Sequence, residues 1–151
     1  MYNITKKLLP LQTKKQSKAH LLETNNSKKN NMKPLNKQFA PKSVMPEKVI
    51  QFGEGNFLRA FVDWIIWNMD QKTDFNGSVV VVQPIERGMV DWLNAQDCLY
   101  HVNLQGRENG KPVNTLERID VISRALNPYS QNAAFMALAD QPEIRFVISN
   151  T

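Results

Sequence analysis

The chain of 151 residues has one cysteine, two histidines and no long apolar run. A single cysteine, Cys98, cannot form an internal disulfide bond, which favours a reducing, cytoplasmic setting. The histidines, His20 and His101, stand alone, and no spacing of metal-ligating residues is visible, so we expect no bound metal. Because no run approaches the roughly 20 apolar residues that span a bilayer, and the cluster at residues 8–11 is too short for a signal peptide, we expect neither a membrane segment nor secretion.

Arginine is absent from the first 45 residues, and aromatic residues are nearly so. This segment carries ten lysines and one acid, a net charge of +9, whereas residues 46–151 carry a net charge of −4. So polar a segment cannot bury enough apolar surface to fold, which predicts a disordered basic tail over residues 1–45. Because the remainder is mildly acidic, we expect no nucleic-acid-binding face on the folded part.

Two other interpretations of the tail stay open. A basic arm could bind nucleic acid or direct the chain to mitochondria, although the absence of arginine argues against a transit peptide. Alternatively, Met32 is the true start, and residues 1–31 are an upstream extension of the reading frame.

The remainder alternates apolar segments with turn residues. The pattern predicts strands over residues 48–52, 78–82, 99–104, around 118–123 and 144–148, and helices over residues 56–70, 89–95 and 130–139. Between two of the strands, residues 105–114 are expected to form a hairpin loop, and Ser130 is expected to cap the last helix. This order predicts an α/β, Rossmann-like, doubly wound and mainly parallel sheet.

The first predicted helix is apolar almost all round. Its large apolar residues recur at helical spacing, which predicts that the helix is buried against the sheet: Phe57, Phe61, Trp64, Ile65 and Met69. The valine run at residues 79–82 is typical of a central parallel strand. Because open sheets normally continue with further strands and a covering helix, we expect the domain over residues 46–151 to be truncated at its C-terminus.

Two glycines, Gly53 and Gly55, separate the first predicted strand from the first helix. Glycine lets the backbone turn sharply and approach a bulky ligand, and the start of the helix favours a phosphate. Strand, Gly-x-Gly and helix form the first half of a dinucleotide-binding unit, although an ordinary strand-to-helix turn is the alternative. The third small position of the usual fingerprint is occupied by Leu58, which prevents the closest approach of helix and strand.

Polar residues at the ends of two other strands complete the candidate site. Glu86, after the second strand, would bind the adenosine ribose and disfavour the 2′-phosphate of NADP, whereas Arg87 beside it would do the opposite. A solvated loop pair is the alternative for both. Ser149, Asn150 and Thr151 follow the last strand and suit hydrogen bonds to a ribose or an amide, or else a helix cap.

Three further residues have a structural and a functional interpretation. Arg59 and Asp63 lie four residues apart and would pair on the helix, or Arg59 would lie near a phosphate. Cys98 has no visible activating partner, so we expect an inert thiol.

The segment from Gln51 to Trp64, QFGEGNFLRAFVDW, resembles the tagaturonate reductase (altronate oxidoreductase) branch of the long-chain mannitol dehydrogenase family. Leu58 and Phe61 stand where the mannitol dehydrogenases and fructuronate reductases tend to carry histidine, which favours this branch. Cys98 stands where the family usually has glycine. The likeness covers roughly residues 32–151. One matching segment precedes the glycine turn, at residues 32–36, and three follow it in order, at residues 79–86, 96–100 and 145–151.

The resemblance implies NAD-dependent reduction of D-tagaturonate, a sugar acid, to D-altronate in hexuronate catabolism, without a metal. It places a cofactor-binding set along the chain: Gly53, Gly55, Asn56 and Phe57 at the pyrophosphate, and Ser149, Asn150 and Thr151 near the nicotinamide ribose. The family's catalytic lysine belongs to a C-terminal helical domain that has no counterpart here. We therefore assign no catalytic residue and expect NADH binding without turnover.

Other functions are compatible with the same residues. The chain could be part of a fructuronate reductase or a polyol (mannitol) dehydrogenase, or a stand-alone, non-catalytic nucleotide-binding module. The sequence leaves the oligomeric state open.

Overall fold

The computed structural model describes residues 33–150. Most of the tail predicted over residues 1–45 lies outside the described residues, including the possible extension at residues 1–31 and the proposed start at Met32. The candidate residue Thr151 lies outside them as well. Every element below belongs to the compact unit Pro34–Thr151.

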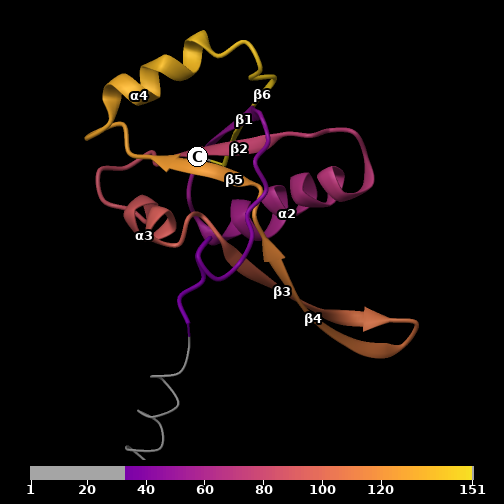
Figure 1. Cartoon of the computed structure of the whole chain (residues 1–151). Helices are drawn as coiled ribbons and strands as arrows, with labels where there is room; N and C mark the ends of the chain where they lie inside the picture. Colours follow the sequence, from indigo (N-terminus) through magenta and orange to yellow (C-terminus); the bar gives the residue numbers. More distant parts are fainter. Residues whose placement is uncertain (1–32, 151) are drawn as a thin grey trace, which may run out of the picture. The chain divides into compact units, whose positions relative to one another are not determined.

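Four parallel strands form the main sheet in the order β5-β2-β1-β6 (Figure 1). They are β1 (Glu47–Phe52), β2 (Ser78–Val82), β5 (Ile122–Leu126) and β6 (Phe146–Ser149). Numbered along the chain as parallel strands, this order is third, second, first and fourth, which is the order of the first four strands in a dinucleotide-binding sheet. The strand order therefore reverses between β1 and β6, and ligands bind at such a switch point in open α/β sheets. The predicted Rossmann-like sheet is confirmed.

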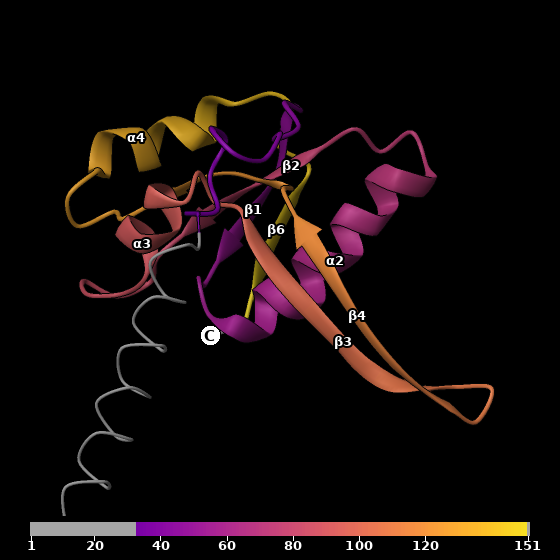
Figure 2. The same ribbon diagram turned by 60° about the horizontal axis from the view of Figure 1, so that its bottom comes forward.

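Helices cover both faces of this sheet. Figures 1 and 2 show α2 (Asn56–Lys72) and α3 (Val90–Ala95) on one face, with α4 (Asn132–Met136) and the 3₁₀ turn η1 (Ala137–Asp140) on the other. Successive side chains of β2 alternate between the two faces of the sheet. Val79 and Val81 pack in the α2/α3 core, whereas Val80 and Val82 pack in the α4/η1 core. The sheet is doubly wound, as predicted.

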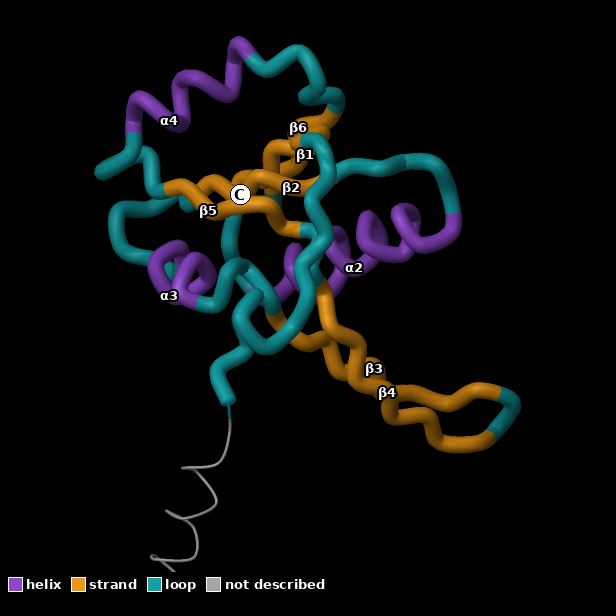
Figure 3. The backbone as a smooth tube through the Cα atoms, in the orientation of Figure 1, coloured by secondary structure: helices purple, strands orange, loops and turns teal. Residues whose placement is uncertain are grey.

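An antiparallel hairpin, β3 (Tyr100–Glu108) and β4 (Lys111–Ile119), projects from the body of the domain (Figures 2 and 3). Asn109 and Gly110 alone connect its strands, with φ of 50° and 77°. Positive φ at both central residues is the condition for a type I′ turn, which Asn-Gly satisfies. The long loop predicted over residues 105–114 is therefore wrong, since the strands continue to this two-residue turn.

Two further expectations need correction. The single strand expected around residues 118–123 is two strands, because β4 ends at Ile119 in the hairpin and β5 begins at Ile122 in the parallel sheet. β-propensity alone does not indicate which sheet a segment joins. Ser130 does not cap the last helix, which begins at Asn132 after Gln131 and has no side-chain cap.

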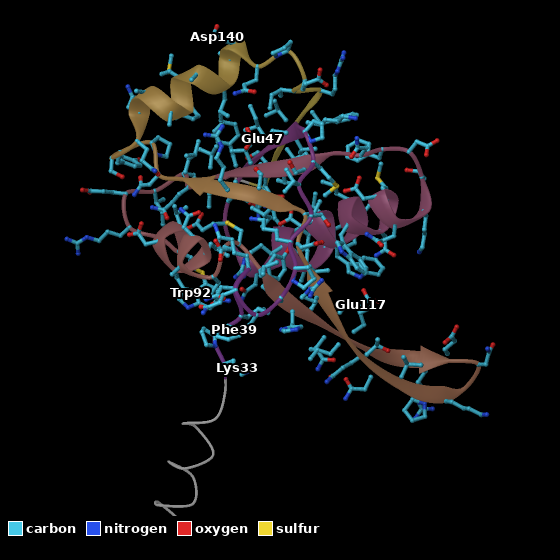
Figure 4. The ribbon with its side chains drawn as sticks, viewed as in Figure 1. Lys33, Phe39, Glu47, Trp92, Glu117 and Asp140 are labelled. Carbon is cyan, nitrogen blue, oxygen red and sulfur yellow. The ribbon has the colours of Figure 1, made fainter. Side chains whose placement is uncertain are left out.

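The apolar stripe predicted to bury α2 is largely exposed. Phe57 and Phe61 keep 63% and 54% of their surface accessible, and the buried residues of the helix include Arg59 and Asp63. A helix that is apolar almost all round has no periodicity that selects one face, so polar partners inside the domain decided its rotation. Trp64 contributes to that choice by donating its indole N–H to Glu117 of β4, which Figure 4 labels on the hairpin.

Residues 34–45, which composition assigns to the tail, are hydrogen-bonded to the sheet domain. Ser43 donates both its backbone N–H and its hydroxyl to the carboxylate of Asp120, and the Lys42 ammonium donates to the carbonyl of Ser123 at 2.9 Å. The compact unit therefore begins earlier than the predicted boundary. Within the described residues, no helix is both long and apolar enough to cross a membrane.

Candidate functional site

Gly53 begins the turn that follows β1. Its backbone N–H donates to the carbonyl of Val82 at 2.9 Å, so the turn continues the ladder between β1 and β2. Its φ of +120° is a conformation that side chains rarely adopt, and an added Cβ would lie 2.8 Å from Asn150 Oδ1 and 3.1 Å from Leu58 Cδ1. Glycine is thus required here by the backbone and by packing, and the same contact places Asn150 beside the turn.

Gly55 precedes α2 and is constrained quite differently. Its φ is −69°, and an added Cβ would meet no atom within 4 Å. The 17-residue helix has no side-chain cap and no acid in its first turn, so the amide N–H groups there keep their capacity to bind an anion. Nothing among the described residues requires glycine at this position. The open space and the uncapped helix start suit a phosphate that approaches the backbone closely.

Arg59 links the glycine turn to α2 through hydrogen bonds of its side chain. Its buried guanidinium donates from Nε to the carbonyl of Glu54 at 2.9 Å and from Nη2 to Asn56 Oδ1, and it lies 5.4 Å from the centre of the Tyr100 ring. Among the described residues no carboxylate lies within 4 Å of it, so the expected pairing with Asp63 is not formed. Arg59 therefore adds an uncompensated positive charge next to the start of the helix, where an anion is favoured.

The loop after β2 is shaped by Gln83, which is only 2% exposed. Its side chain accepts a hydrogen bond from the N–H of Val90 at 3.1 Å and donates to the carbonyls of Ile85 and Glu86 at 2.7 and 3.1 Å. The side chains of Glu86 and Arg87 are exposed on this loop. The structure therefore leaves Glu86 accessible to a ligand at the end of the strand next to β1, as the ribose interpretation requires.

Gly88 joins this loop to the glycine turn. An added Cβ would lie 2.2 Å from Glu54 Oε1 and 2.5 Å from Gln83 Oε1, so the buried Glu54 side chain fills the space above it. Sequence reasoning missed both Gly88 and Glu54. No local signal was available, because Gly88 lies in a loop six residues after β2 ends and its neighbour Glu54 comes from a distant turn.

The last strand reaches the site from the opposite side of β1. Ser149 pairs with Phe52 in the parallel register, and the exposed Asn150 follows it. Phe57 is exposed on the first turn of α2, and its ring centre lies 5.6 Å from that of Phe61. The candidate residues after β1 and β6 are thus neighbours, Glu86 lies at the end of β2, and Thr151 lies outside the described residues.

Behind the turn lies a buried carboxyl, Asp63. Gln51 Nε2 donates to the carbonyl of Gly53 at 3.1 Å and to Asp63 Oδ2 at 3.4 Å. Burial raises the pKa of Asp63 to about 7, against the opposing effects of hydrogen bonds from Gln51 and Tyr100 and of the Arg59 charge. Sequence reasoning did not single out Gln51, because a glutamine in a strand carries no motif.

The other reactive side chains lie apart from the turn. Cys98 is buried, and burial raises the pKa of its thiol to about 11, which agrees with the expected inert cysteine. His101 is exposed on β3. The described part of the chain contains no group of three or more His, Cys, Asp and Glu side chains that could hold a metal ion.

Comparison with known families relates this arrangement to other proteins. Residues 47–151 match the family model described as the mannitol dehydrogenase Rossmann domain. Altronate oxidoreductases of Phocaeicola vulgatus and Bacteroides thetaiotaomicron are 77% and 76% identical over 120 residues, and that of Bacillus subtilis is 48% identical over 121 residues. Each alignment covers 80% of this chain and 25% of the relative, so the chain spans about a quarter of their length.

Solved structures share the fold at lower identity. The mannitol 2-dehydrogenase of Pseudomonas fluorescens, in a ternary complex with NAD and D-mannitol, has a TM-score of 0.62 at 23% identity, over 77% of this chain and 26% of its own. A substrate-free D-sorbitol dehydrogenase has a TM-score of 0.59 at 22% identity, over 72% of this chain and 23% of its own.

Proposed function

The chain belongs to the mannitol dehydrogenase family, and from that premise we propose that it binds NAD at the glycine turn. We further propose that it is the NAD-binding part of an oxidoreductase that reduces D-tagaturonate to D-altronate with NADH. The observation that carries the proposal is the unobstructed, uncapped start of α2 at Gly55, beside the switch point between β1 and β6. The substrate comes from the name of the relatives, altronate oxidoreductase, and from the Leu58 and Phe61 positions of the motif.

Residues at the ends of three strands would each bind a different part of the dinucleotide. Gly53, Gly55, Asn56 and Phe57 would hold the pyrophosphate, where backbone N–H groups and the Arg59 charge attract it. Three polar residues after β6 would contact the nicotinamide ribose: Ser149, Asn150 and Thr151. When bound, the reduced dinucleotide supplies the hydride that converts the substrate's ketone into a secondary alcohol.

Glu86 would bind the adenosine ribose hydroxyls from the loop after β2. Its exposed carboxylate would repel a 2′-phosphate, which favours NADH over NADPH, while the adjacent exposed Arg87 acts in the opposite direction. We expect Glu86 to prevail because acidic residues at this strand end select NAD. Titration with NADH and NADPH in parallel measures the preference, and Glu86→Gln should reduce it.

This chain's residues orient the cofactor, and we assign none of them to catalysis. Since it spans about a quarter of its relatives' length, we expect NADH binding without turnover. The single cysteine favours a cytoplasmic setting. Oxidation of NADH that depends on tagaturonate, catalysed by residues 1–151 alone, would contradict that expectation.

The proposal is tested by titrating the full 151-residue chain with NADH and following energy transfer from tryptophan. Gly55→Asp is the informative variant because aspartate is a preferred N-cap and stabilises a helix start, yet its carboxylate would occupy the phosphate position. We expect at least a tenfold loss of NADH affinity with no loss of stability.

Two matched variants interpret this result. Gly55→Asn has nearly the same shape without the charge, so it should bind NADH more tightly than Gly55→Asp. Gly106→Ala lies in the hairpin, where an added Cβ also meets nothing within 4 Å, and should bind like the unmodified chain. Full affinity in Gly55→Asp, or no NADH binding by the unmodified chain, would refute the proposed site.

A further inference from the structure

Three buried polar side chains meet behind the glycine turn, and we call them the acid cluster: Gln51 of β1, Asp63 of α2 and Tyr100 of β3. Gln51 and Asp63 have no accessible surface, and Tyr100 is 6% exposed. Tyr100 Oη lies 3.3 Å from Asp63 Oδ2, and Gln51 Nε2 lies 3.4 Å from the same oxygen. The acid cluster therefore joins the first strand, the helix that follows the turn, and the hairpin.

If Asp63 were ionised, the acid cluster would have too few donor protons to form the hydrogen bonds that its short distances indicate. A phenol has one proton, and Tyr100 Oη lies 2.9 Å from the carbonyl oxygen of Arg59, which can only accept. Once that proton is donated to Arg59, the longer contact with Asp63 Oδ2 is a hydrogen bond only if the carboxyl supplies the proton. The geometry thus favours a neutral, protonated Asp63.

An unsatisfied oxygen of Asp63 supports the same conclusion. Asp63 Oδ1 is buried and has no hydrogen-bond partner within residues 33–150. An ionised carboxylate here would be a buried, acceptor-only group whose closest donors lie 3.3 and 3.4 Å away. Burial of a charge is costly without short hydrogen bonds or an ion pair, and a proton on Asp63 removes that cost.

The surrounding elements offer little compensation for a negative charge. Arg59, on the same helix, is the one cation that lowers the pKa of Asp63, and its guanidinium is already bonded to Glu54 and Asn56. β1 contributes a neutral amide, and burial raises the pKa values of Tyr100 on β3 and of Cys98 before it, so both stay neutral. From β4, the Glu117 carboxylate accepts from Trp64 and adds no positive charge.

We infer that Asp63 carries a proton in the folded chain and, through Gln51, positions the carbonyl of Gly53, so that the turn binds a dinucleotide pyrophosphate well only while that proton is present. Gln51 is the link, because the same amide nitrogen donates to Gly53 at 3.1 Å and to Asp63. The amide has one N–H for each acceptor, so an ionised Asp63 would draw the whole amide group toward itself and lengthen the hydrogen bond to the Gly53 carbonyl. It would likewise draw the Tyr100 hydroxyl from the Arg59 carbonyl. Asp63 and Gln51 are positioning residues, and the inference rests on the proposed function.

The test is the NADH affinity of the full chain between pH 6 and pH 8. Burial raises the pKa of Asp63 to about 7, so if only the protonated form binds, affinity should fall about tenfold over this interval. Asp63→Asn keeps the shape and the donor but cannot ionise, so its affinity should not change with pH. His101→Gln is the control, because imidazoles also change charge near neutral pH, and it should retain the tenfold dependence.

A second measurement does not depend on NADH. The infrared spectrum of the unmodified chain should contain a protonated-carboxyl C=O band at pH 6 that disappears by pH 8, and Asp63→Asn should lack that band. Absence of this band at pH 6, or an unchanged pH dependence of affinity in Asp63→Asn, would overturn the inference. A chain that shows the band but binds no NADH would instead refute the proposed function alone.

Discussion

Substitution of Gly53 by alanine should destabilise the domain mainly through the backbone. A φ of +120° costs a residue with a Cβ about 1–3 kcal/mol. The added methyl would lie 3.1 Å from Leu58 Cδ1, a buried atom that must move slightly, and 2.8 Å from Asn150 Oδ1, on an exposed side chain that can turn away. Strain dominates and crowding adds less, so we expect a loss of about 2–3 kcal/mol in the free energy of unfolding.

Urea denaturation of the full chain, followed by tryptophan fluorescence, measures this loss. With a slope of about 1–3 kcal/mol per molar urea, the midpoint should fall by about 0.7–3 M. The double variant Gly53→Ala/Asn150→Ala separates backbone strain from crowding. Because strain dominates, removal of the Asn150 side chain should restore little of the lost stability. Gly106→Ala is the matched control without positive φ or contacts. An unchanged midpoint in Gly53→Ala, or full recovery in the double variant, would refute the reasoning.

Three further outcomes follow from the buried groups. Because the pKa of Asp63 is raised from 3.8 to about 7 on folding, the unfolded chain releases this proton first. Its contribution to stability is therefore complete below about pH 4 and declines by about 1.4 kcal/mol per pH unit until about pH 7. Urea midpoints at pH 5 and pH 8 should differ less in Asp63→Asn than in the unmodified chain, and equal differences would contradict this. Arg59→Lys replaces the two nitrogens that reach Glu54 and Asn56 by one ammonium nitrogen, which cannot reproduce the planar fork, so its free energy of unfolding should fall by about 1.5–3 kcal/mol in the same urea assay. An unchanged midpoint would show that the fork is not needed. Cys98 should react with a thiol reagent only after unfolding, and rapid labelling of the native chain would show that it is not buried.

Local sequence signals predicted the framework of the site well. The strand over residues 78–82 has the predicted bounds, and the strand before the glycine turn and the helix after it differ only at one end. These signals are local because β-branched runs, turn glycines and helical periodicity act through neighbouring residues. The order of elements was then enough to predict a doubly wound parallel sheet.

Prediction failed where a residue's surroundings come from distant parts of the chain. The stripe at Phe57 and Phe61 satisfied helical periodicity, yet α2 also buries Asp63, because the hydrogen-bond partners of Asp63 lie on β1 and β3. The loop predicted over residues 105–114 failed for a different reason, because Asn109-Gly110 is a local hairpin signal that fits a two-residue turn. Nothing adjacent in sequence indicates that Gly88 packs against Glu54.

Local signals in the chain are enough to specify the glycine turn, the helix that starts from it and the class of sheet that holds both, because these depend on backbone conformation and on short-range apolar patterns. Packing between distant segments places Asn150 against Gly53, holds Gln83 in the loop after β2 and buries Asp63 behind the turn. Each of these depends on which distant donor, acceptor or methyl group occupies a given space. That choice is made by packing of the whole domain, where a buried polar group must find its partner or give up its charge.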